Sequence, residues 1–111
     1  MPHYLCKLKP PRPTFFVDMT REEAMVMRGH REYWMPRVEI GAVIAMGPVA
    51  DPAGAYGVAI IEAPSLAALE AMQASDPAIL AKRGFVYENF PMPTIAVRPS
   101  MPLAPIASVT P

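Results

Sequence analysis

The chain has 111 residues, and its ten basic and ten acidic side chains cancel, so it has no net charge with neutral histidines. This balance leaves no electrostatic footprint for a polyanion and argues against a nucleic acid partner. The length fits one domain with one modest core. Because 52% of residues are apolar and only 18% are charged, apolar surface should remain once that core is filled, and self-association would cover it.

The cysteine content and the N-terminal residues indicate the cellular compartment of the protein. Cys6 is the one cysteine, so the chain cannot form an internal disulfide, which fits a reducing compartment. The opening residues, MPHYLCKLKPP, lack the pattern of a signal peptide, and no stretch reaches about 18 apolar residues. We therefore expect a cytoplasmic protein that does not contact the membrane.

The first predicted element is a strand from Tyr4 to Leu8, whose side chains alternate between two faces. Prolines at positions 10, 11 and 13 end it, because proline lacks the N–H group that a continuing strand would use. A connection of about ten residues should follow, and connections of this length often carry function.

The first predicted helix begins at Thr20, which forms a capping box with Glu23. Pro36 should kink or break this helix near Met35, and Gly41 is a suitable stop. The side predicted to face a sheet consists of Met27, Arg31, Trp34 and Val38, with Ala24 and Met35 beside them.

Two strands should follow, over residues 43–49 and 56–63, joined by the turn Asp51-Pro52-Ala53-Gly54. A second helix should open after Pro64-Ser65 and close near Asp76-Pro77, and residues 78–82 could add one more turn.

The last predicted strand covers residues 85–90, and the prolines at 91 and 93 would confine any continuation to a sheet edge. The final residues, RPSMPLAPIASVTP, are rich in proline and show no pattern. We expect this tail to be disordered or to lie as an extended arm on a partner subunit.

The predicted order of elements is β-α-β-β-α-β, an α+β arrangement with both helices on one face of a four-stranded antiparallel sheet. The other face is left bare. A second copy of the chain could cover it through a twofold, self-complementary interface, so we predict a homodimer.

His30 is the candidate catalytic residue, since it lies at the edge of the helix side that faces the sheet and an imidazole can act as a general base or acid. The alternative is a histidine that is simply hydrogen-bonded to a carbonyl group or to water. Asp76 could hold the imidazole in one tautomer, or it could only organise the turn before Pro77.

Other residues could bind a substrate. Arg12, in the long connection, could bind a carboxylate or phenolate through its guanidinium group, although most loop arginines are only solvated. Gly47-Pro48 suggests a bulge or a close backbone approach to a ligand, or else simply an edge strand.

The sequence offers no metal-ligand spacing, because its two histidines and one cysteine are scattered. No glycine pattern follows a strand and opens a helix, so nucleotide binding has no support. We expect no cofactor.

Several short motifs together resemble the YCII-related proteins over roughly residues 3 to 97. They are Arg12-Pro13-Thr14-Phe15, Asp18-Met19-Thr20 with Glu23, Met27 with His30 and Tyr33-Trp34, Gly47-Pro48-Val49, and Asp76-Pro77.

This resemblance implies a ferredoxin-like domain over residues 1–98, with the proline-rich tail at 99–111, and a dimeric α/β barrel that encloses a sheet-lined space. It also implies a site built around His30 and Asp76. We expect Arg12, Trp34, Gly47 and Pro48 to be the substrate contacts of this site. One related protein type is a dehydrochlorinase acting on a chlorinated hydroxyquinol. The wider group includes isomerases and monooxygenases that act without bound metal.

Three functions compete at this point. The first is a cofactor-independent lyase or isomerase that acts on a small aromatic or unsaturated acid, with His30 moving a proton, Asp76 orienting the ring and Arg12 anchoring the anion. The second is a non-catalytic dimer that binds a small ligand or docks to a larger enzyme. The third is a stable dimer whose pocket is filled by its own side chains.

Overall fold

The computed structural model describes residues 1–99, so the predicted tail lies outside the described residues from position 100 onward. The elements in chain order are β1 (His3–Lys9), α1 (Phe15–Asp18), α2 (Arg21–Glu39), β2 (Val43–Val49), β3 (Tyr56–Glu62), α3 (Leu66–Ala74), α4 (Pro77–Leu80) and β4 (Val86–Met92).

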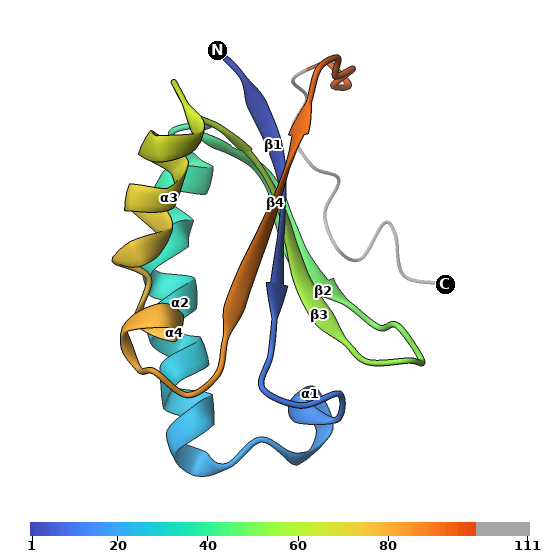
Figure 1. Ribbon diagram of the computed structural model, residues 1–111, viewed down its shortest axis with the longest axis vertical. Coiled ribbons are helices and arrows are strands. Elements are labelled where there is room, and N and C mark those ends of the chain that lie inside the picture. Colours follow the sequence, from blue (N-terminus) through green and yellow to red (C-terminus); the bar gives the residue numbers. More distant parts are fainter. Residues whose placement is uncertain (100–111) are drawn as a thin grey trace, which may run out of the picture.

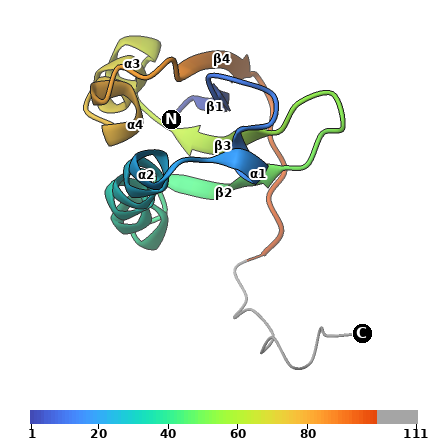
Figure 2. The same cartoon turned by 90° about the horizontal axis from the view of Figure 1, so that it is seen from below.

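The four strands form one antiparallel sheet in the order β2-β3-β1-β4. Helices α2, α3 and α4 lie together on one face of this sheet, while the chain that follows β4 passes over the opposite face (Figures 1 and 2). The predicted split β-α-β-β-α-β arrangement, and with it the ferredoxin-like α+β class, is confirmed. None of the helices within residues 1–99 is long and apolar enough to cross a membrane.

Alternation along the strands decides which side chains enter the core. In the central strand β1, Tyr4, Cys6 and Leu8 are buried under the helices, and the residues between them face the opposite side of the sheet. One core cluster gathers Tyr4 and Cys6 with Trp34 of α2. A second cluster at the other end of β1 gathers Leu8 with Phe15, Ala78 and Phe85.

Helix α2 begins as predicted, because Thr20 accepts from the backbone of Glu23 and the Glu23 carboxylate accepts from the backbone of Thr20. Of the kink or break predicted near Met35, the break is wrong, since the helix continues through Pro36 to Glu39. Pro36 lies in the last turn, where a side-chain hydrogen bond from Arg37 to the carbonyl of Tyr33 supplements the backbone ladder.

The predicted inward side of α2 was also partly wrong, because Arg31 and Ala24 are exposed. Trp34 is buried, and Met27 and Val38 pack against the core clusters, as predicted. Glu23, which was not in the predicted set, also turns inward. Gly41 follows the helix with φ of +89°, as expected of a helix stop.

Both edges of the sheet carry prolines. Strand β4 runs through Pro91 to Met92, two residues beyond the predicted end, and it lies at an edge where one side needs no partner. Gly47-Pro48 lies on the other edge strand, β2, in regular register with β3. The register shift in β2 falls between Val43 and Ala45, so the strand has no bulge at Gly47-Pro48. The position of this pair on an edge strand is what accommodates the proline.

The connection after β1 is organised by Phe15, which is fully buried and packs edge-on against Phe85 with ring centroids 5.0 Å apart. Phe15→Ala should therefore lower the free energy of unfolding by about 3–5 kcal/mol. Val17, in the same short helix, is 86% exposed, so Val17→Ala should change it by less than about 0.5 kcal/mol. Urea unfolding measures both, and equal effects would show that the Phe15 side chain is not a core element.

Candidate functional site

Asp76 lies where α3 gives way to α4, and its side chain is completely buried. It is the N-cap of α4: its Oδ1 atom accepts from the backbone N–H of Ala78 at 2.8 Å, and Pro77 occupies the first helical position. Aspartate and proline in this order are typical of a helix start. The turn-forming role expected for Asp76 is therefore present.

Three side chains also donate to the same carboxylate. His30 Nδ1 lies 2.8 Å from Oδ2 and 3.0 Å from Oδ1. The indole N–H of Trp34 donates to Oδ2 at 2.8 Å, and the hydroxyl of Tyr87 donates to Oδ2 at 2.5 Å. With the backbone N–H of Ala78, four donor groups surround Asp76.

These donors reach Asp76 because of simple spacings in the sequence. His30 and Trp34 are four residues apart on α2 and therefore lie on one side of it. Tyr87 is at a position of β4 that faces the helices, opposite Leu8 of β1. The carboxylate thus ties α2, α4 and β4 together.

The surroundings determine the ionisation of the group. Burial raises the pKa of Asp76, but the hydrogen bonds from His30, Trp34 and Tyr87 outweigh it and hold the pKa below its usual value. Burial, followed by the neighbouring charge of Asp76, raises the pKa of Tyr87 well above its usual value. Asp76 is therefore an ionised acceptor at neutral pH and Tyr87 remains a protonated donor.

An ionised carboxylate can only accept, so Nδ1 of His30 must carry a proton. In the neutral ring the Nε2 atom is then left with a free lone pair, which is the tautomer that a general base needs. The His30 side chain is 15% exposed while that of Asp76 is fully buried, so the histidine is the member of the pair that reaches the surface.

Arg12 is engaged with protein carboxylates. Its two terminal nitrogens bind the two oxygens of Glu23 at 2.7 and 2.8 Å, and its Nε binds Asp18 at 2.8 Å. Hydrogen bonds from Arg12 lower the pKa of Glu23 to about 2. Arg12 does border a cavity of about 340 Å³ that also touches Lys7 and Lys9, but its guanidinium group fixes the β1–α2 connection in this structure.

The other expected substrate contacts lie apart from His30. Trp34 is only 2% exposed, so its indole acts on Asp76 and offers no accessible surface to a ligand. Gly47 and Pro48 lie on the far edge strand β2, and the space beside Gly47 is open. His3 forms an ion pair with Glu62 at 3.1 Å when it is protonated.

Two cavities on the described part of the chain are lined without His30 or Asp76. His30 reaches the surface without bordering either of these two cavities. Among residues 1–99, no three His, Cys, Asp or Glu side chains gather in a way that could hold a metal ion.

The geometry defines a small α+β domain in which a buried aspartate orients a histidine. The profile of the YCII-related domain matches residues 4–93, and the chain belongs to this family. The resemblance found in the sequence motifs is thereby confirmed. No curated protein matches the chain.

Two contacts were not predicted from the sequence, that of Tyr87 with Asp76 and that of Glu23 with Arg12. Tyr87 was placed only as a strand residue, although the alternation Phe85, Tyr87, Asn89 already assigns it to the helix-facing side. Glu23 was recognised only as a helix cap, and nothing local in the sequence indicates that it also pairs with Arg12.

Asp76→Asn should lower the free energy of unfolding by at least about 3 kcal/mol near pH 7, because an amide cannot accept from every donor now facing the carboxylate. Since the folded-state pKa of Asp76 is depressed, this stabilisation is present above about pH 4 and is lost as the pH falls through the lower folded pKa. Urea unfolding of the wild type and of Asp76→Asn at a series of pH values measures this difference in the free energy of unfolding.

The wild type should therefore lose stability on acidification more steeply than Asp76→Asn. The exposed turn variant Asp51→Asn should follow the wild-type curve and serves as the control. Parallel curves for Asp76→Asn and the wild type would contradict the ionised, hydrogen-bonded state assigned to Asp76.

Proposed function

We propose that this YCII-related protein is a cofactor-independent lyase or isomerase that acts on a small aromatic or unsaturated acid. The observation that carries the proposal is the fixed tautomer of His30: Asp76 accepts from Nδ1, so Nε2 of the neutral ring is free to accept a proton. A histidine that is held in this way is the usual arrangement of a general base.

The proton transfer can be written with this chain's own groups. Nε2 removes a proton from a carbon next to the acid or carbonyl group of the substrate, and the electron pair of that C–H bond moves into the substrate. In a lyase the pair expels a leaving group, such as chloride, from the adjacent carbon. In an isomerase the imidazolium returns the proton at another carbon. The ionised Asp76 stabilises the imidazolium in either case.

A second function, a non-catalytic binding protein, is favoured by a different observation. The two described cavities lie away from His30, so a ligand could bind there without meeting the base. In that case the Asp76 network would serve only to hold the helices on the sheet.

Screening small aromatic and unsaturated acids, including a chlorinated hydroxyquinol, by thermal shift and then by product formation tests the enzyme proposal. For a substrate found in this way, His30→Asn should lower kcat by at least about 100-fold. His3→Asn is the matched control and should leave kcat unchanged, because His3 contacts Glu62 and not Asp76. Turnover that survives in His30→Asn would remove His30 as the base. Acids that bind without turnover would favour the binding protein.

We further propose that two copies pair through the open face of the sheet, the face opposite the helices. On this face Leu5 of β1 lies directly between Ile60 of β3 and Phe90 of β4, and Phe90 is 50% exposed. A twofold contact would bury this apolar surface on both copies at once. Cys6 is the one cysteine of the sequence and is a free thiol, which is usual in a reducing compartment, and we also propose a cytoplasmic setting.

Phe90→Asp should convert the dimer into a monomer in sedimentation velocity, because a charge at this position would have to be buried without a partner. Met25→Asp, on the outer surface of α2 where the side chain is 69% exposed, should leave the dimer intact. A wild-type chain that sediments as a monomer, or a Phe90→Asp variant that stays dimeric, would contradict pairing through this face.

A further inference from the structure

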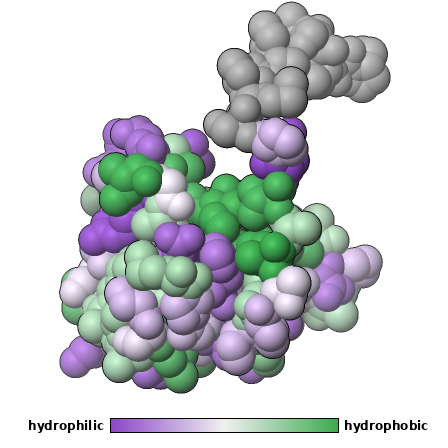
Figure 3. Space-filling view, turned by 90° about the horizontal axis from the view of Figure 1, so that it is seen from above, coloured by the Kyte–Doolittle hydropathy of each residue, from purple (hydrophilic) through white to green (hydrophobic). Residues whose placement is uncertain are grey.

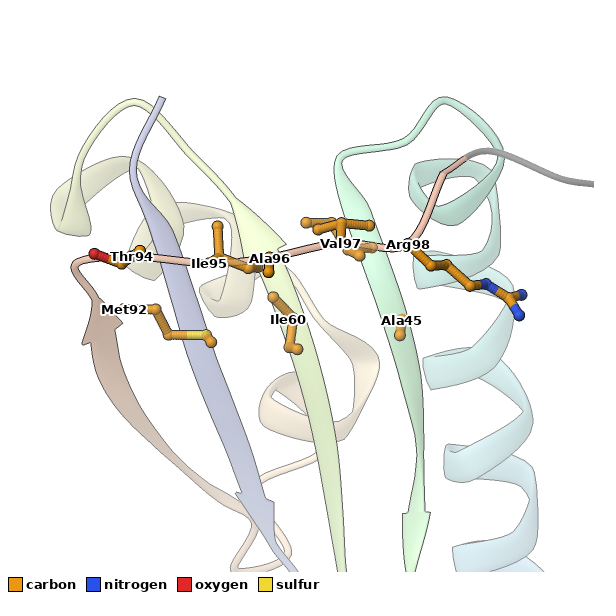
Figure 4. A pocket seen from close by; sticks show the side chains of 9 residues that line it. Ala45, Ile60, Met92, Thr94, Ile95, Ala96, Val97 and Arg98 are labelled. Atoms are coloured by element: carbon orange, nitrogen blue, oxygen red, sulfur yellow. The ribbon is translucent and has the colours of Figure 1, made fainter.

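The chain that follows β4 turns across the open face of the sheet. Residues 93–98, which we call the crossing segment, pass over β1 and β3 to reach β2 (Figure 4). Within residues 1–99 no backbone hydrogen bond joins the crossing segment to the sheet. Its N–H and C=O groups therefore remain available to other partners.

A cavity of about 510 Å³ lies between the crossing segment and the sheet. This volume is in the range of small-molecule sites. Its apolar walls come from both sides: Ile44, Ala45, Ile60 and Met92 from the strands, and Ile95 and Val97 from the crossing segment. In the view from above, apolar residues gather beside the end of the described chain (Figure 3).

The charge at this cavity has one sign. Arg98 borders it, whereas no aspartate or glutamate is among the residues that line it. Arg98 is exposed, and among the described residues it makes no hydrogen bond or ion pair, in contrast to Arg12 with its two carboxylates. Its side chain extends outward past β2 at the edge of the cavity (Figure 4). An anion at that edge would find a guanidinium group that is not already engaged.

We propose that this cavity binds a small monocarboxylic acid with an apolar body, the carboxylate on Arg98 and the body between Ile60 and Ile95. The combination of apolar walls and one polar group at the rim is what orients such a ligand. This site shares no residue with the His30–Asp76 pair, and the inference does not depend on the proposed reaction. A second copy on the same face would either enclose the cavity or fill it.

Isothermal titration calorimetry of the full chain with octanoate tests the proposal. The wild type should bind octanoate saturably, and Arg98→Ala should weaken binding about tenfold, the loss expected for a hydrogen bond to a charged group. Arg83→Ala removes another exposed arginine outside the cavity and should not change binding. Octanol, which keeps the apolar body without the charge, should bind the wild type no more tightly than octanoate binds Arg98→Ala.

A second pair of variants tests the cavity itself. Ala45→Phe places a ring among its walls and should abolish octanoate binding, while Ala67→Phe, at an exposed position of α3, should not. If octanoate does not bind the wild type saturably, the proposal is overturned. This is the result expected if a second copy of the chain fills the cavity. Binding that Arg98→Ala and Ala45→Phe both leave unchanged would overturn it equally.

Discussion

The side chain of Asp76 is removed from water and nevertheless carries a charge, and much of the structure is arranged around that fact. An isolated carboxylate in a protein interior would be protonated or would destabilise the fold. Here four N–H and O–H groups replace the lost water, and the three that belong to side chains lower the pKa of Asp76 in spite of its burial. Each donor comes at a defined position, so the network is satisfied in one arrangement of helices and sheet.

The position of the helices on the sheet follows from this constraint together with two neighbouring contacts. Asp76 holds α2 and α4 against β4, and the amides of Gln73 and Asn89 exchange two hydrogen bonds of 2.8 Å between α3 and the same strand. Tyr33 of α2 donates to the carbonyl of Met72 in α3. No buried side-chain nitrogen or oxygen within residues 1–99 lacks a partner, so this polar layer costs the fold little.

Much of the fold could be predicted from the sequence, because the signals that start the helices and form the turn lie in neighbouring residues. The capping box at Thr20, the turn at Asp51–Gly54 and the helix start at Ser65 depend on neighbouring residues, and all three are present. The inward positions of Met27, Trp34 and Val38 on α2 could be predicted from their spacing. The inward position of Glu23 could not, because it depends on the contact with Arg12 outside the helix. The continuation of α2 through Pro36 likewise depends on what its last turn contacts.

The candidate site, too, could be predicted only in part from the sequence. His30 and Asp76 stood out because of their chemistry, and the family motifs brought them together, but they are 46 positions apart in the sequence, and the distance between them depends on the fold of the chain in between. Tyr87 and the Arg12–Glu23 pair also required the tertiary structure, since a buried hydrogen bond leaves no local signal at either partner. The open sheet face and the crossing segment form a second surface, separate from the polar layer around Asp76. Ligand binding at this surface can be measured without involving His30 or Asp76.

The most direct test of the account is the tautomer of His30. Long-range ¹H–¹⁵N NMR correlations of the histidine rings, recorded at a pH where the ring is neutral, distinguish a proton on Nδ1 from one on Nε2. We predict that the proton is on Nδ1 and that Asp76→Asn disturbs this preference. A neutral ring with its proton on Nε2 in the wild type would contradict the arrangement of Asp76 and His30, and with it the assignment of His30 as a general base.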